Sequence, residues 1–179
     1  ESVDLFADDY KARNFVVSAR DRCDETVDRL RGVRTARFKY IRNYLPDRPY
    51  LQPNAYKDNK SIIKAMRRLH ADGQLDAAQS LIMRETRPPE ELFDLKADPL
   101  ELHNLAGDES HAKVLAEHRS MLDHWTKETS DQGMHDEPAK VYDSDMKIYL
   151  DTMKVRRPER FEEIAANVAL MKKWASEGK

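Results

Sequence analysis

The chain has 179 residues, of which 36% are charged, and its formal net charge is −2. This length suits one domain, with or without an appended tail. The mean hydropathy is −0.84, and no apolar run approaches the roughly 18 to 20 residues of a membrane span, so none is expected in this stretch. The nearly neutral charge argues against a dedicated nucleic-acid binder. The only cysteine is Cys23, which excludes an internal disulfide and a cysteine-rich metal site.

The first part of the chain is predicted to form strands joined by a charged connection. Residues 14–19 are apolar and β-branched, as is typical of a strand. Residues 20–30 are densely charged and lack an apolar face, so they are predicted to form an exposed loop or a short helix. Residues 31–44 are predicted to form a hairpin that reverses near Thr35, although the turn lacks the Asn-Gly or Gly-rich sequence of favoured two-residue turns.

The middle of the chain is predicted to hold two short helices and a strand. Apolar residues between 61 and 73 recur at helical spacing, and Gly73 suits the end of that helix. A second helix is predicted over residues 74–84. A proline pair then leads into a strand whose apolar residues are Leu92, Phe93 and Leu95.

A tightly specified turn is predicted directly after this strand. Asp98 suits a helix N-cap, with Pro99 at the first helical position. Glu101 stands three residues beyond the cap, where its carboxylate can complete a capping box. Asn104 tolerates the left-handed conformation that would close one helical turn. A strand plus a capped turn accounts for these residues and carries no chemistry by itself.

The remainder is predicted to be helical. Asp108 or Ser110 is expected to cap a helix that extends to Thr129, with Trp125 anchoring it on the sheet. Residues 129–138 are predicted to be a linker. Two further helices are expected, a short one over 141–153 and an amphipathic one that begins at Pro158.

Two of these stretches resemble the C-terminal part of the sulfatase family. Residues 91–105 match the family pattern ELYDLxxDPxExxNL, with Phe93 in place of tyrosine as the only visible departure. Residues 33–43 are similar to the family hairpin VRTxRYKYIRN. The resemblance covers roughly residues 14–133 and looks closest to the N-sulfoglucosamine sulfohydrolase (sulfamidase)-like group and related bacterial enzymes.

The resemblance implies a fold and a domain organisation. The expected fold class is α+β, a small antiparallel sheet of three to four strands with a long C-terminal helix packed on it, plus additional helices. Residues 1–133 would form a sulfatase C-terminal subdomain, and residues 134–179 a helical C-terminal extension. The natural partner would be the N-terminal catalytic domain of the same parent chain, and a homo-oligomer is left open.

The chemistry of the family is not expected in this chain. Sulfatases use a formylglycine, made from a Cys or Ser that is followed by Pro or Ala two residues later and by Arg four residues later. Cys23 fails at both positions, and no serine fits. The family's calcium prefers oxygen ligands. Asp143 and Asp145 are close in sequence, but such a pair on a charged chain is typical of a surface. No catalytic or metal-ligating residue is therefore assigned, and calcium and formylglycine are implied for the parent enzyme alone.

One short stretch, Arg20-Asp21-Arg22, is the candidate for substrate binding. In the sulfamidase-like group an ARDR sequence follows the strand that corresponds to residues 15–19, and the resemblance implies that this turn reaches toward the substrate pocket. Arginine forks match sulfate and carboxylate oxygens, and a carboxylate can accept hydrogen bonds from sugar hydroxyls. The alternative is a self-paired surface loop of alternating charge.

The favoured function is therefore the C-terminal part of a sulfatase-like hydrolase, acting on sulfate esters or sulfamates, as of a sulfated saccharide. If the parent follows the family, its compartment is periplasmic, extracellular or lysosome-like. The alternative is a non-enzymatic module that binds an acidic polymer or a protein through the basic and aromatic residues between 29 and 50. Such a run is more commonly explained by Lys and Arg side chains at alternating strand positions, which pack their methylene groups on the sheet and keep their charges in water.

Overall fold

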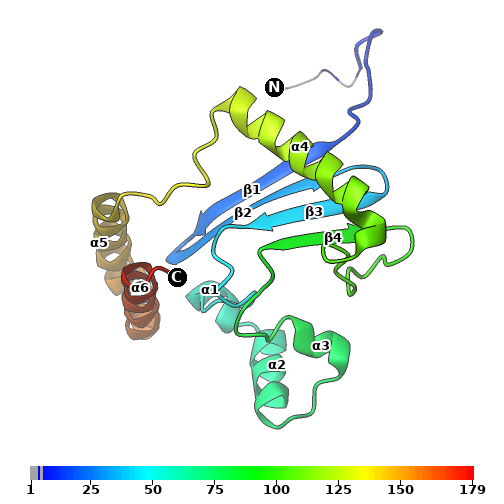
Figure 1. Cartoon of the computed structure of the whole chain (residues 1–179). Coiled ribbons are helices and arrows are strands. Elements are labelled where there is room, and N and C mark those ends of the chain that lie inside the picture. Colours follow the sequence, from blue (N-terminus) through cyan, green and yellow to red (C-terminus); the bar gives the residue numbers. More distant parts are fainter. Residues whose placement is uncertain (1–3, 5) are drawn as a thin grey trace.

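The computed structural model describes residue 4 and residues 6–179. At its centre lies a four-stranded antiparallel sheet in the order β1-β2-β3-β4 (Figure 1). The strands are β1 Val16–Cys23, β2 Thr26–Arg34, β3 Phe38–Asn43 and β4 Glu90–Asp94. The helices are α1 Ala55–Asp58, α2 Ser61–Ala71, α3 Ala77–Leu81, α4 Ala112–Thr129, α5 Ala139–Arg156 and α6 Phe161–Ser176, and short 3-10 turns precede α4 and α6. The expected α+β fold, with a long helix packed on a small antiparallel sheet, is confirmed.

Residues 20–30 form strands, so the expected loop or short helix was wrong. β1 continues to Cys23, and β2 begins at Thr26 after a two-residue turn in which Asp24 has a φ of 51°. Two charged side chains of β2, Asp28 and Arg31, are buried because other parts of the chain supply their partners. Asp28 pairs with a buried arginine, and Arg31 pairs with two carboxylates. A strand stabilised in this way has no alternation of apolar and polar residues that the sequence could reveal.

The predicted hairpin over residues 31–44 is confirmed as the β2–β3 connection. Its turn is held by Thr35, whose main-chain N–H donates to the Phe38 carbonyl oxygen at 2.9 Å. The Thr35 hydroxyl oxygen accepts from the Phe38 N–H at 3.0 Å. A side chain thus closes this turn in place of the Asn-Gly backbone geometry.

Both helices predicted before β4 are present, but only α2 has the predicted length. α2 matches the predicted range, and Gly73, two residues beyond its end, has the left-handed φ of 66° expected after a helix. α3 is shorter than the predicted 74–84 helix, because Asp76 starts it with a capping box to Gln79.

The turn after β4 differs from the predicted capped helical turn. Glu101, not Asn104, adopts the left-handed conformation, with a φ of 55°. The Glu101 carboxylate accepts from Lys39 Nζ at 2.6 Å and does not complete a capping box. Asp98 accepts instead from the main-chain N–H of His103 at 2.7 Å. The residues predicted to cap a helix therefore fix an irregular loop.

The loop has a structural purpose at the outer edge of β4. The Asn104 side chain accepts from the Leu92 N–H at 2.9 Å and donates to the Glu90 carbonyl oxygen at 3.0 Å. The Leu105 N–H also donates to the Leu92 carbonyl oxygen, at 2.8 Å. An edge strand leaves such groups without partners, so the loop satisfies the edge in place of a fifth strand.

The principal core lies between the sheet and α4. Its fully buried side chains come from neighbouring strands and from one face of the helix: Val33, Tyr40, Leu92, Leu115 and Leu122. Leu122 has an exposed fraction of 0%, whereas Trp125 is only partly buried at the margin of the cluster. Trp125, the predicted anchor, therefore lies at the edge of this core, and Leu122 is the most deeply buried residue of α4.

A second core holds the C-terminal helices. α5 and α6 pack on each other and on α1 through six buried residues: Ala55, Tyr142, Met146, Ile164, Val168 and Met171. The two helices lie beside the ends of β1 and β2 that are joined by the turn at Asp24 (Figure 1). α5 is longer than the predicted 141–153 helix, and α6 follows a 3-10 turn that begins at Pro158, as expected. In the described part of the chain, no helix has the length and apolar character needed to cross a membrane.

Candidate functional site

The predicted substrate-binding residues lie in the second half of β1, where the register of its pairing with β2 shifts between Arg20 and Arg22. Such a bulge changes the direction in which successive side chains point. Arg20 is 42% exposed, and its Nε lies 3.8 Å from Oδ2 of the buried Asp28. Arg20 does not line the cavity beside this end of the sheet.

Asp21 and Arg22 do line that cavity, but they have different partners. Asp21 accepts from the guanidinium of Arg31 at 2.8 and 3.2 Å. Arg22 donates to Asp145 at 2.5 Å and to Glu137 at 3.3 Å, which ties β1 to α5 and to the linker before it. The three predicted residues therefore do not converge on one point, and two of them share a cavity.

Arg31 is the centre of the polar contacts on this side of the sheet. It is 1% exposed and donates to both carboxylate oxygens of Asp131, at 2.9 and 2.8 Å. Burial alone would lower the pKa of Arg31, but hydrogen bonds to Asp131 and Asp21 raise it above its ordinary value. The hydrogen bonds from Arg31 in turn lower the pKa of Asp131. Arg31 thus joins β2 to the linker that follows α4.

Gly133 allows the linker to close over Arg31. A Cβ at this position would lie 1.7 Å from Arg31 Nη2, a distance that no side chain could occupy without displacing the guanidinium. The position needs glycine for this close approach. In the sequence Gly133 is only a glycine in a predicted linker. Its role could not be predicted before Arg31 was placed beside it.

The cavity lined by Asp21 and Arg22 has a volume of about 890 Å³. It lies between the turn end of β1 and β2, the linker, α5 and α6. Apolar and aromatic side chains form part of its wall: Val27, Tyr44, Leu45, Tyr142 and Met171. Ligand pockets are commonly of about 300 to 1,000 Å³, with a mainly apolar lining and a few polar groups. Its size and lining suit a small polar molecule with a ring.

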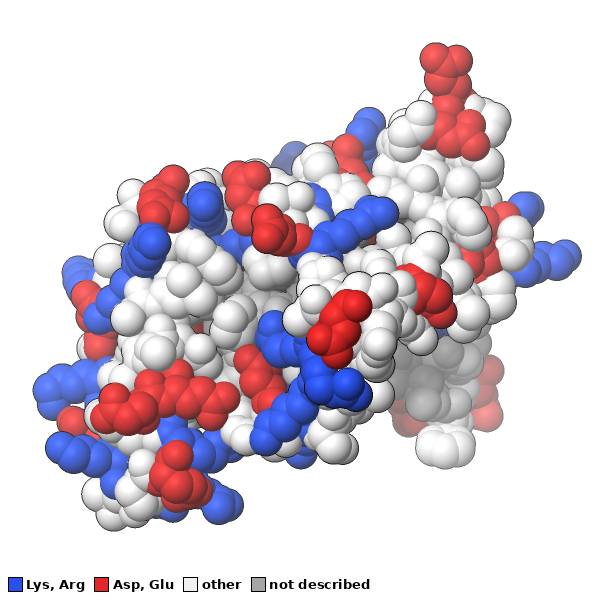
Figure 2. Space-filling view, turned by 90° about the horizontal axis from the view of Figure 1, so that it is seen from below, with Lys and Arg blue, Asp and Glu red and all other residues white. Residues whose placement is uncertain are grey.

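The carboxylates around this cavity are paired with cations. The pairs are Asp21 and Asp131 with Arg31, Asp136 with Arg29, Glu137 with Arg22, and Asp143 with Lys172. Acidic and basic side chains are likewise interspersed on the face of the molecule that Figure 2 shows, which is seen from below in relation to Figure 1.

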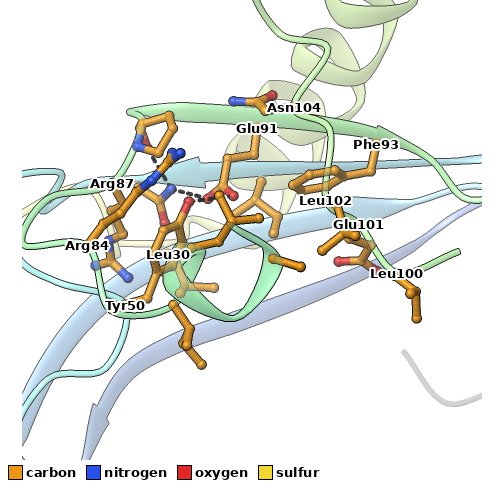
Figure 3. Close-up of a pocket in the computed structure, with 16 residues that line it drawn as sticks. Leu30, Tyr50, Arg84, Arg87, Glu91, Phe93, Leu100, Glu101, Leu102 and Asn104 are labelled. Carbon is orange, nitrogen blue, oxygen red and sulfur yellow. Dashed lines mark hydrogen bonds between the residues drawn. The ribbon is translucent and has the colours of Figure 1, made fainter. Parts of the chain in front are cut away.

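A second cavity, of about 380 Å³, lies on the sheet face away from α4, between α3 and the loop after β4 (Figure 3). Glu91, which is 5% exposed, points into it from β4. Its carboxylate accepts from Asn43 at 2.7 Å and from the Tyr50 hydroxyl at 2.8 Å, and burial raises the pKa of Tyr50. Glu91, Asn43 and Tyr50 already hydrogen-bond to one another, so this cavity is a weaker candidate than the larger one.

The residues of this chain do not fit the calcium that the resemblance implies. Among the described residues, no group of three or more His, Cys, Asp or Glu side chains is arranged to hold a metal ion. Asp143 and Asp145 form ion pairs with Lys172 and Arg22. Cys23 is exposed and lacks the residues that accompany a formylglycine. None of these side chains is therefore assigned to the metal or to the nucleophile.

Comparison with known proteins connects this chain to sulfatases. An ulvan-active sulfatase of Formosa agariphila is 43% identical over 115 residues, which are 64% of this chain and 19% of that protein. A Delta 4,5-hexuronate-2-O-sulfatase of Bacteroides thetaiotaomicron is 50% identical over 42 residues, which are 24% of this chain and 9% of that protein. The chain thus spans less than a fifth of the length of either relative. No family model matches it.

Solved structures include similar chains. A 2-O GAG sulfatase has 26% identity and a TM-score of 0.40, over 68% of this chain and 18% of that one. A protein solved with its substrate D-glucosamine-2-N,6-O-disulfate has 20% identity and a TM-score of 0.38, over 73% of this chain and 19% of that one. The family resemblance of the two sequence motifs is confirmed by the curated relatives. This chain is therefore similar to a part of known sulfatases, as the two sequence motifs indicate.

Proposed function

We propose that this chain is the C-terminal part of a sulfatase that hydrolyses sulfate esters or sulfamates of saccharides. The observation that carries the proposal is the 43% identity to an ulvan-active sulfatase, over a stretch that makes up 19% of that protein. The second curated relative is named for the 2-O-sulfate of a hexuronate, which is again a sulfated sugar. The N-terminal catalytic domain of the same parent would supply the nucleophile and the calcium site.

In this proposal the chain forms one wall of the substrate pocket. Arg20, Asp21 and Arg22 would orient the sugar by hydrogen bonds to its sulfate, carboxylate or hydroxyl groups. Support comes from Asp21 and Arg22, which line a cavity of suitable size. Arg22 has a side chain that is 27% exposed and partners that are 41% and 43% exposed, so a ligand could take over its hydrogen bonds.

We also propose that residues 1–133 form the sulfatase C-terminal subdomain and residues 134–179 a helical extension. The two hydrophobic cores support this division, because α4 packs on the sheet and α5 packs with α6. The extension would shape the substrate wall, since the linker, α5 and α6 close the larger cavity.

The alternative, a non-enzymatic module for an acidic polymer, rests on the basic and aromatic residues between 29 and 50. Most cations of that run already have carboxylate partners, which weakens an attraction to polyanions. These pairs are Arg29–Asp136, Arg31–Asp131, Arg37–Asp94, Lys39–Glu101 and Arg42–Asp123.

The 179-residue chain by itself is expected to be inactive. With calcium and a chromogenic aryl sulfate, it should release no phenol above the buffer rate, because its residues supply neither the nucleophile nor the metal site. The longer protein that contains it should turn over the same substrate. Calcium-dependent turnover by the chain alone would contradict the proposal, and a longer protein without a nucleophile motif would favour the binding module.

Within the longer protein, Arg22→Gln is expected to lower kcat/KM on the natural sulfated saccharide by roughly ten- to a hundredfold, as for loss of a hydrogen bond to a charged group. Arg68→Gln is the matched control, since Arg68 is 66% exposed on α2, away from the cavity. Circular dichroism and urea unfolding of the purified variants separate a binding defect from a folding defect. An unchanged kcat/KM for Arg22→Gln would remove this residue from the substrate site.

A further inference from the structure

Arg48 is a buried cation with an unused donor at the larger cavity. It is 2% exposed and lines the cavity wall. Its Nη1 donates to the Val27 carbonyl oxygen at 2.8 Å and its Nη2 to the main-chain oxygen of Lys179 at 2.7 Å. Its Nε is buried without a hydrogen-bond partner. Buried polar atoms of this kind are rare in proteins and call for an explanation.

The Arg48 guanidinium is held by the oxygens of Val27 and Lys179, and the latter belongs to a terminal carboxylate in the 179-residue chain. Among the residues that the structure describes, no Asp or Glu carboxylate lies within ion-pair distance of this guanidinium. Burial lowers the pKa of Arg48, and the neighbouring Arg29 and Arg87 lower it further, while Asp28 acts in the opposite direction. Asp28 is already paired with Arg87. Buried arginines are usually paired with a carboxylate, and an anion in the cavity would supply a partner for the unused Nε.

Arg29 offers a second unused donor in the same cavity. Its side chain is 11% exposed, and its Nη2 lies 2.5 Å from Asp136 Oδ1. Its Nη1 is buried and has no hydrogen-bond partner. Asp136 is 87% exposed on the linker, and an ion pair with such an exposed partner contributes little, about 0 to 1 kcal/mol. A bound anion could therefore displace Asp136 from Arg29.

We propose that Arg48 and Arg29 form a binding site for the oxyanion of an acidic saccharide, a sulfate or a carboxylate group, inside this cavity. The proposal rests on the proposed function for the choice of a saccharide, and on the unused guanidinium donors for the anion. Two other cations of the wall, Arg22 and Lys172, are held by carboxylates. The aromatic ring of Tyr142 and the side chain of Met171 provide an apolar surface for a sugar ring.

Tryptophan fluorescence of the 179-residue chain can test this site. The ring of Trp174 lies 5.3 Å from the Arg48 guanidinium carbon, and replacing the only other tryptophan by Trp125→Phe makes Trp174 the sole reporter. Titration with glucuronate and with glucose 6-sulfate, at constant ionic strength, is expected to give a saturable change, and glucose none. A response to glucuronate alone would identify a carboxylate as the bound group, and a response to glucose 6-sulfate alone would identify a sulfate. No saturable response to either would overturn the proposal.

Three variants, made in the Trp125→Phe background, link the signal to Arg29 and include a control. Arg29→Gln is expected to weaken binding by roughly tenfold or more, the effect of losing a charge-assisted hydrogen bond. Asp136→Asn should strengthen binding, because it removes the carboxylate that competes for Arg29, and a folding defect could not produce this sign. Arg68→Gln should leave the affinity unchanged.

An affinity that is the same in Arg29→Gln, or weaker in Asp136→Asn, would contradict the site. Failure of binding in a chain whose longer form is an active sulfatase would overturn this inference alone. An inactive longer form with intact binding would overturn the proposed function alone.

Discussion

Asp28→Asn is expected to lower the free energy of unfolding by about 3 to 5 kcal/mol, the cost of leaving one member of a buried ion pair without its partner. The side chains of Asp28 and Arg87 are 4% and 2% exposed, and both guanidinium Nη atoms of Arg87 donate to the carboxylate. Arg87 Nε already lacks a partner. After the substitution the buried cation would keep one uncharged amide oxygen and the Leu45 carbonyl oxygen, at 3.4 Å, as acceptors, and it would face an amide NH2 in place of the other carboxylate oxygen.

Urea unfolding at pH 7, followed by circular dichroism, measures this loss. Asp151→Asn is the control, because Asp151 and Lys147 form a pair whose side chains are 69% and 78% exposed, and such pairs contribute about 0 to 1 kcal/mol. The double variant Asp28→Leu with Arg87→Met should recover most of the stability, since apolar pairs can replace a buried ion pair. A loss below about 1 kcal/mol for Asp28→Asn would mean that water reaches Arg87.

Elements with a clear apolar period could be predicted from the sequence. α2, α4 and α6 each present apolar residues at helical spacing, and each is present where that spacing predicts it. The signature after residue 90 indicated the family and the strand β4. The conformation of the turn was missed, because Asn104 bonds to the main chain of β4, a contact that local capping rules do not include.

The charged residues 20–30, which form the hairpin of β1 and β2, could not be predicted as strands, because the partners of their side chains are distant in sequence. Arg31 meets Asp131 across 100 residues, Asp28 meets Arg87 across 59, and the buried Glu25 accepts from Asn167 across 142. Before these partners are placed, a run rich in charged residues is indistinguishable from a solvated loop. Long-range pairing, and not local propensity, makes this segment a strand.

The candidate site was only partly visible in the sequence. Arg20, Asp21 and Arg22 were singled out through the family resemblance, and two of them line the larger cavity. Much of the rest of that cavity comes from residues beyond 133, for which the resemblance gave no guide. Arg29 and Arg48 appeared only as members of a basic run, since a missing partner can be recognised only after the other side chains are in place.

Leu122→Ala is expected to be the second strongly destabilising change, with a loss of about 2 to 5 kcal/mol in the free energy of unfolding. Leu122 is 0% exposed and lies on α4 in the cluster that contains Val33, Tyr40 and Leu92. Removing its side chain leaves a cavity at the point where the helix meets the centre of the sheet. The sequence favoured Trp125 as the anchor, with a cost of about 3 to 5 kcal/mol for Trp125→Ala, the range for a buried tryptophan.

Comparison of these two variants decides which residue fixes α4. Because Trp125 is partly exposed at the margin of the cluster, Trp125→Ala should cost less than the range for a fully buried ring. Leu100→Ala makes the same chemical change as Leu122→Ala at a residue that is 74% exposed, and it should alter the stability by no more than about 0.5 kcal/mol. If Leu122→Ala also fell within that limit, α4 would be held mainly by contacts outside this chain, and its packing on the sheet would follow from the longer protein.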